Sequence, residues 1–151
     1  MKVEEVYVSF EVAKLLKEKG FEIDTSKDYW KIGEDGTMYF MSSIGAYTSD
    51  INNKFAFYRP ADTYPCPTQQ MAMRWLREEH KMYVCIDIKC FMPHLGKIDG
   101  YSACIWYKPE NNAGICCYWV YPPKQQEAWD TYEAATEAAI KYCLEDLIKK
   151  N

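Results

Sequence analysis

The stretch from Tyr64 to His80 reads YPCPTQQMAMRWLREEH and combines a stop signal with a helix. Proline lacks a backbone N–H and restricts the residue before it, so Pro65 and Pro67 end the preceding element. Thr68 then caps a helix with its hydroxyl. The apolar residues of this helix recur at helical spacing: Met71, Ala72, Trp75 and Leu76. The stretch predicts a helix that braces the fold, followed directly by a strand.

Two further helices are predicted, one near each end of the chain. Ser9 can cap the segment FEVAKLLKEK, and Gly20 stands where a left-handed residue ends a helix. Near the other end, Thr131 or Asp130 can cap a helix that runs to about Lys150. Its packed face is predicted from helical spacing: Ala135, Ala138, Ala139, Tyr142, Cys143, Leu147 and Ile148.

The strand signals lie between these helices. Residues 28–40 predict a hairpin around the turn Glu34-Asp35-Gly36, and Met82–Cys90 alternates strictly, as a half-buried strand does. Residues 101–108 and 115–121 predict a second hairpin. Residues 41–64 are expected to form a long loop, with a short strand at 55–58 as an option.

This order predicts one α+β domain over residues 1–151. We expect an antiparallel sheet of about five strands and three helices, in the order helix, two strands, helix, three strands, helix. Runs of neighbouring strands with short links favour antiparallel pairing with the helices on one side.

Composition limits the function classes. The 151 residues carry a formal net charge of −4 and no basic cluster, which disfavours binding to nucleic acid through its phosphates. The N-terminal MKVEEVYVSFEVAKLL does not resemble a signal peptide, and no apolar run is long enough to span a membrane. We therefore expect a cytoplasmic protein whose seven cysteines are reduced thiols.

The sequence predicts no catalytic residue, metal site or cofactor. The residues with metal-binding side chains lack the paired spacing of a zinc site: Cys85, Cys90, His94, Cys104, Cys116 and Cys117. We expect the cysteines to be small buried apolar groups. His80 is expected to have a structural role at a helix end, and His94 to be solvated.

The second predicted hairpin is the most informative feature, because both of its faces are apolar or aromatic. A sheet with one solvated face should alternate with polar residues, so something should cover the second face. Helices or the 41–64 loop are the first expectation; a self-association surface or a pocket that stacks a planar ligand is the alternative. The candidate binding residues are Tyr101, Trp106, Tyr107, Tyr118, Trp119 and Tyr121, with Arg59 as a cation for an anionic ligand.

Two other arginines offer positive charge. Arg74 and Arg77 lie outside the apolar stripe of the central helix. We expect surface solvation and ion pairing there, for example between Arg74 and Glu78 one helical turn apart.

Three stretches together resemble an uncharacterised family of small proteins encoded by bacteriophages and prophages of gut Bacteroidetes. They are VSFEVAKLLKEKGF (residues 8–21), CPTQQMAMRWLREEH (66–80) and YEAATEAAIKYCLEDLI (132–148). The resemblance covers the helices, and its matching positions are capping and packing residues. It implies a phage accessory protein made inside an infected bacterium, and it transfers no catalytic residue.

The leading hypothesis is therefore a non-enzymatic phage accessory protein in the host cytoplasm. It would bind a host protein or a small host ligand, with an anti-defence role as one option. The alternative is a small hydrolase with a Cys/His or carboxylate site assembled by the fold. Nucleic-acid binding through exposed aromatics is a third, disfavoured hypothesis, and a homodimer through the aromatic hairpin is a structural expectation.

Overall fold

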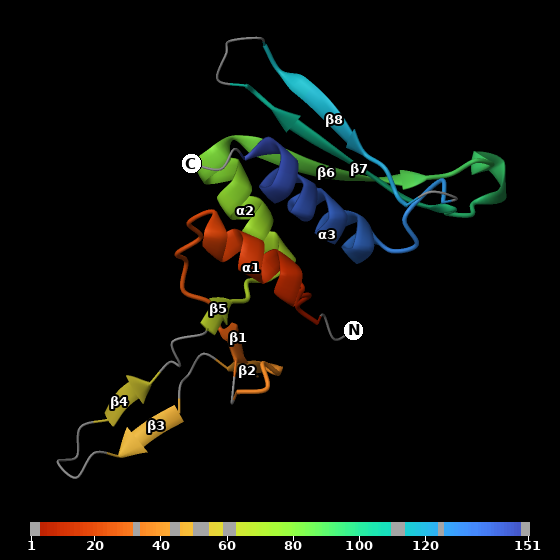
Figure 1. Cartoon of the computed structure of the whole chain (residues 1–151). Helices are drawn as coiled ribbons and strands as arrows, with labels where there is room; N and C mark the ends of the chain where they lie inside the picture. The colour runs from red at the N-terminus through yellow and green to blue at the C-terminus, as the bar shows by residue number, and fades with distance from the viewer. Residues whose placement is uncertain are drawn as a thin grey trace. The chain divides into compact units, whose positions relative to one another are not determined.

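The computed structural model of the chain describes seven segments (Figure 1). They are residues 4–31, 34–42, 46–49, 55–58, 63–109, 114–123 and 126–148. The chain divides into two compact units, which are Tyr7–Pro67 and Met1–Val6 together with Thr68–Asn151. The single domain expected over residues 1–151 stays a prediction.

The chain is an α+β protein, as predicted, with three α-helices among the described residues. In chain order the elements are α1 (Phe10–Glu18), β1 (Lys27–Lys31), β2 (Met38–Ser42), β3 (Ala46–Ser49), β4 (Phe55–Tyr58), β5 (Thr63–Pro65), α2 (Gln69–His80), β6 (Met82–Lys89), the 3-10 helix η1 (Pro93–Leu95), β7 (Gly100–Tyr107), β8 (Cys116–Val120), α3 (Tyr132–Tyr142) and the π-helical turn η2 (Cys143–Leu147).

The sheet arrangement corrects the prediction of one sheet of about five strands. The described strands form two three-stranded antiparallel sheets, β2-β1-β5 and β6-β7-β8, and a two-stranded pair, β3-β4. The observed order is helix, five strands, helix, three strands, helix. Residues 41–64, expected to be a loop, contain the end of β2, then β3, β4 and most of β5; the optional short strand at 55–58 is confirmed as β4. Strands of three or four residues are too short to show a clear alternation of apolar and polar residues in the sequence. Their conformation depends on pairing with neighbouring strands.

The ends of α1 follow the predicted signals. Ser9 caps the helix, and its hydroxyl accepts a hydrogen bond from a backbone N–H of the first turn. Gly20 has φ +86° and donates to the carbonyl of Lys17, while the N–H of Phe21 donates to the carbonyl of Leu16 at 2.9 Å. This pair of bonds is a Schellman motif. Phe21 folds back into the core and is 3% exposed.

The first sheet lies in the same unit as α1. In the central strand β1, Tyr29 faces Phe40 of β2 on one side and Tyr64 of β5 on the other. The Tyr29 hydroxyl donates to the carbonyl of Val8 at 3.0 Å, and the next residue, Trp30, is buried. The predicted hairpin of β1 and β2 is confirmed.

The helix α2 braces the second unit. Thr68 caps it, accepting a hydrogen bond from Met71 N–H at 3.2 Å, and Lys81 ends it with φ +55°. The buried residues of the helix are Gln69, Ala72, Trp75 and Leu76. Gln69, which the apolar pattern did not include, donates to the carbonyl of Glu133 at 3.0 Å and so connects α2 to α3.

In this unit α3 lies along one side of the strands β6 and β7 (Figure 1). The side chains between helix and sheet are buried: Met82, Ala103, Ile105, Ala135, Ala139, Ile140, Cys143 and Leu144. The side chains of β6 alternate between the two faces of the sheet, as predicted. Those on the inner side become more exposed from Met82 toward Ile88. Ile88 shares a face with Val84 and is 61% exposed, so the predicted half-buried face does not extend to that end.

The last helix begins as predicted and ends differently. Thr131 caps α3 and accepts a hydrogen bond from Ala134 N–H at 3.1 Å. The continuous helix expected to about Lys150 becomes a π-helical turn at Cys143–Leu147. Thr136 is also buried, whereas the predicted face left it out. Ile140 and Leu144 are buried as well, whereas the predicted residues Ala138, Tyr142, Leu147 and Ile148 are only partly buried. The buried face is thus shifted from the predicted one, because α3 contacts both α2 and the second sheet.

Candidate functional site

Strand register divides the β6-β7-β8 sheet into two faces. Directly paired residues share a face, and neighbours along a strand alternate. Val84 pairs with Ile105, which pairs with Tyr118; these residues lie on the inner face, the face that α3 covers. Tyr83 pairs with Trp106 and lies on the opposite, outer face. The helix α3 therefore covers only one of the two sheet faces that are apolar in the sequence.

The outer face carries large aromatic rings that are about half exposed or more. Tyr83 of β6 is 49% exposed, Trp106 of β7 is 45% exposed and Trp119 of β8 is 50% exposed. Tyr121, which follows β8, is 79% exposed. We call these four residues the outer aromatic face. Tyr83 was not among the predicted binding residues, although the alternation of β6 places it opposite Val84.

The predicted residues separate into two groups. Trp106, Trp119 and Tyr121 belong to the outer aromatic face. Tyr101, Tyr107 and Tyr118 lie on the inner face by strand register. The remaining candidate, Arg59, lies outside the described residues.

The inner tyrosines pack against neighbours rather than forming one surface. Tyr107 and Tyr118 have ring centroids 5.3 Å apart. A side-chain hydrogen bond with Tyr118, together with burial, raises the pKa of Tyr107 to about 12. The ring of Tyr101 contacts that of Tyr132 of α3, edge to face at 6.1 Å. These contacts hold the rings at the rim of the core, where Tyr118 is 37% exposed, and a binding role for the three residues stays a prediction.

Three cysteines form a row across the outer face, one on each strand. Cys85 faces Cys104 directly, and Cys117 lies diagonally across from Cys104, opposite Trp106. Burial, followed by the neighbouring thiols and Asp87, raises the pKa of Cys104 to about 11. In the segments that the structure describes, no group of three or more His, Cys, Asp or Glu side chains could hold a metal ion.

A shallow pocket of about 310 Å³ lies where β8 separates from β7. Its lining residues are Lys89, Tyr101, Ser102, Trp119, Val120, Tyr121, Pro122 and Glu127. Pro122 has no N–H to continue the ladder, and the segment at Trp129 takes over the pairing with Tyr101 through two backbone hydrogen bonds. Lys89 Nζ donates to the carbonyl of Glu127 at 2.6 Å and fixes the other wall. The residues that line the pocket carry aromatic, hydroxyl, ammonium and carboxyl groups.

The histidines and buried thiols give little support to nucleophilic catalysis. His80 ends α2, the position predicted for it, and its ring packs edge-on against Trp75 with centroids 4.6 Å apart, a contact that the sequence did not predict. His94 is exposed in η1, as expected. Burial raises the pKa of Cys143 to about 12. A raised pKa keeps the thiols of Cys104 and Cys143 protonated and therefore weakly nucleophilic.

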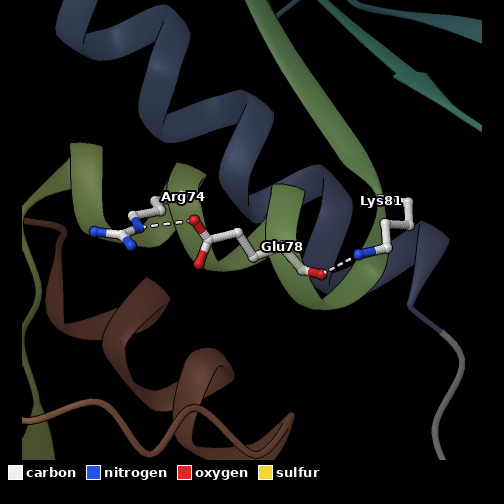
Figure 2. Close-up of polar contacts among 3 residues, drawn as sticks. All are labelled: Arg74, Glu78 and Lys81. Atoms are coloured by element: carbon white, nitrogen blue, oxygen red, sulfur yellow. Dashed lines mark hydrogen bonds and ion pairs between the residues drawn. The ribbon is translucent and has the colours of Figure 1, made fainter.

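Arg74 of the central helix is engaged in the predicted ion pair. Arg74 Nε lies 2.8 Å from Glu78 Oε1, and Lys81 Nζ donates to the backbone carbonyl of Glu78 at 2.5 Å (Figure 2). Both side chains of the ion pair are more than half exposed, so it contributes little to stability. Lys81 reinforces the end of the helix by binding one of its last carbonyls.

Comparisons with models of known protein families, with curated proteins and with solved structures found no match for this chain. Among the described residues, the helices are all too short or too polar to cross a membrane.

Proposed function

We propose that this chain is a non-enzymatic binding protein and that the outer aromatic face is its contact surface for a partner protein. In this proposal it is a phage accessory protein that acts on a host protein in the cytoplasm of an infected bacterium, with an anti-defence role as one form of that action. The phage origin rests on the sequence resemblance of the three helical stretches.

One observation carries the proposal: Trp106 and Trp119 are about half exposed on the sheet face opposite α3. Exposed tryptophan and tyrosine rings in one patch favour association, because each ring buries a large area and retains a polar edge. Such residues are frequent among the few that dominate interface energies.

A partner protein fits this surface better than nucleic acid does. Among the described residues of β6, β7 and β8, the outer face carries one carboxylate, Asp87, and one ammonium, Lys89, so these strands present no excess of positive charge. The whole chain carries −4. Phosphate binding depends on displacing counterions with several lysines or arginines, and that requirement is not met here.

The direct test is affinity capture from a gut Bacteroidetes host, with captured proteins identified by mass spectrometry. We expect one host protein to be retained by wild type, and Trp106→Ala or Trp119→Ala to weaken its binding about 30-fold. Tyr39→Ala, which removes a ring of similar exposure (46%) from β2, is the matched control and should bind like wild type. Equal capture by all variants, or no specific capture, would contradict the proposal.

A small host ligand is the second candidate, and the pocket beside Trp119 favours it. A planar compound stacked there should raise the melting temperature of the wild type in a thermal-shift screen of nucleosides and aromatic metabolites. Trp119→Ala should abolish the shift, whereas Trp106→Ala should retain it, because Trp106 is on the same face but does not line the pocket. A screen without any stabilising compound argues against this candidate and leaves the protein partner as the only form of the proposal.

A further inference from the structure

The backbone hydrogen bonds of β7 show which N–H and C=O groups of β8 point toward β7. Tyr101 exchanges both of its backbone hydrogen bonds with Trp129, at 2.8 and 2.9 Å. Trp129 lies on the β8 side of β7, because β6 occupies the other side, where Ile88 faces Tyr101. Backbone direction alternates along a strand, so Ile105, four residues later, also points its N–H and C=O toward β8, where it faces Tyr118.

The alternation leaves an unpaired row on the far side of β8. Cys117 and Trp119 flank Tyr118, so their N–H and C=O groups point away from β7. The order of the sheet ends at β8, and no other described strand pairs with it. An extended strand is the element that can bind such a row along its whole length.

Between Ile115 and Tyr121 this edge lacks the charges and prolines that commonly protect an edge against pairing. Natural edge strands carry charges, proline or a bulge that block a second strand. Residues 115–121 read ICCYWVY, with no charge and no proline, and the flanking Ile115 and Tyr121 are 73% and 79% exposed. At the opposite edge of the sheet, β6 carries Asp87 and Lys89.

We infer that β8 pairs with β8 of a second copy of this chain, antiparallel across a two-fold axis at Tyr118. In that register Cys117 faces Trp119 of the second copy and exchanges both backbone hydrogen bonds with it, and the symmetry repeats the exchange. Every side chain of the edge meets an uncharged one, so the strand is complementary to itself. The two sheets join into one of six strands, which removes both open β8 edges at once.

The same edge suits a second copy better than an unrelated strand. A two-fold interface uses one patch twice and closes on itself, so no open row is left for further growth. The pairing also brings the outer aromatic faces of the two copies side by side. It uses backbone groups of β8, so it does not depend on the partner protein proposed above.

The test uses two substitutions at one position. Cys117→Pro removes an edge N–H that β7 does not use and leaves all four rings of the outer aromatic face in place. Cys117→Ala removes the thiol and keeps the N–H. By analytical ultracentrifugation in reducing buffer, we expect wild type and Cys117→Ala to form dimers in the high micromolar range. Cys117→Pro should weaken dimerisation at least about tenfold, because two hydrogen bonds are lost per dimer.

A cross-linking variant decides the matter even where Cys117→Pro does not fold, as judged by circular dichroism. On the two-fold axis residue 118 faces itself at a non-hydrogen-bonded position, where Cα atoms lie about 4.5 Å apart and a disulfide can form. Tyr118→Cys should give a covalent dimer under mild oxidation, well above the level of wild type. Tyr83→Cys, on β6, should not exceed wild type.

Three results overturn the inference. They are a wild type that stays monomeric in the high micromolar range, a folded Cys117→Pro variant that dimerises like Cys117→Ala, and a Tyr118→Cys variant that cross-links no better than wild type. Host-protein capture by the monomeric Cys117→Pro variant distinguishes a failure of self-association from a failure of the proposed function.

Discussion

Gly100 and Ala128 lie so close that a Cβ built on Gly100 would sit 2.6 Å from the Cβ of Ala128. The same added atom would lie 2.7 Å from the carbonyl oxygen of Trp129. This approach lets the segment at Ala128 and Trp129 continue the pairing of β7 after β8 has ended. This wall of the pocket can therefore form in its observed position only because Gly100 has no side chain.

Gly100→Ala should therefore destabilise the protein by about 2–4 kcal/mol, since the new methyl group meets backbone and φ is +150°. Gly96→Ala is the matched control: φ there is +64°, and an added Cβ meets nothing within 4 Å, so only the conformational cost of about 1 kcal/mol is expected. Urea unfolding measures both. Equal losses for the two variants would show that the close approach is unimportant.

Two isoleucines test the burial gradient along the second sheet. Ile105 is fully buried under α3, and Ile88, on the same face, is 61% exposed. Ile105→Ala should lower the free energy of unfolding by about 2–5 kcal/mol, and Ile88→Ala by less than about 1 kcal/mol. Chemical denaturation of both variants checks the difference. A large loss for Ile88→Ala would mean that its end of the sheet is covered in the native protein.

Local signals carried most of the helix prediction. Ser9, Thr68 and Thr131 each accept a hydrogen bond from the first turn, as their positions in the sequence indicated. Capping depends on residues three positions apart, so one sequence suffices to find it. The division into two sheets could not be found in this way. β1 pairs with β5 through Tyr29 and Tyr64, and nothing in the sequence around either residue indicates the other as its partner.

The outer aromatic face was only partly predictable from the sequence, again because contacts between distant segments determine it. Alternation places Trp106 and Trp119 on strand faces, but both faces of the hairpin are apolar in sequence. Which face the helix covers depends on the docking of α3, a contact between segments far apart in the chain. Tyr83 was missed because it lies on a neighbouring strand outside the aromatic hairpin. Its place beside Trp106 is fixed only by cross-strand register.

Two substitutions of Thr68, the N-cap of α2, test whether its hydroxyl stabilises the helix. Thr68→Ala removes the hydroxyl that accepts from Met71 N–H and should cost about 1 kcal/mol of stability. Thr68→Ser keeps an acceptor in the same place and should recover most of that loss. Thermal and urea unfolding of the two variants give the comparison. If serine is as damaging as alanine, packing of the threonine methyl group explains the effect and capping does not.

The buried thiol of Cys143 predicts a loss of stability at alkaline pH. Burial raises its pKa from 9.0 to about 12 in the folded protein. Below pH 9 the thiol is protonated in both states and has no pH-dependent effect. Above that value the unfolded state loses the proton first. The free energy of unfolding should therefore fall by up to about 1.4 kcal/mol per pH unit until the folded thiol ionises.

Cys143→Ala isolates this contribution, because Cys104 and Tyr107, whose pKa values are also raised, remain in both proteins. Near neutral pH the variant should be less stable by about 1–2 kcal/mol, since it leaves a small cavity. That deficit should shrink in urea titrations above about pH 9 and disappear or reverse by about pH 11, as only the wild type has the thiol to ionise on unfolding. A deficit that stays constant with pH would show that the thiol reaches solvent in the folded protein and titrates near its ordinary pKa.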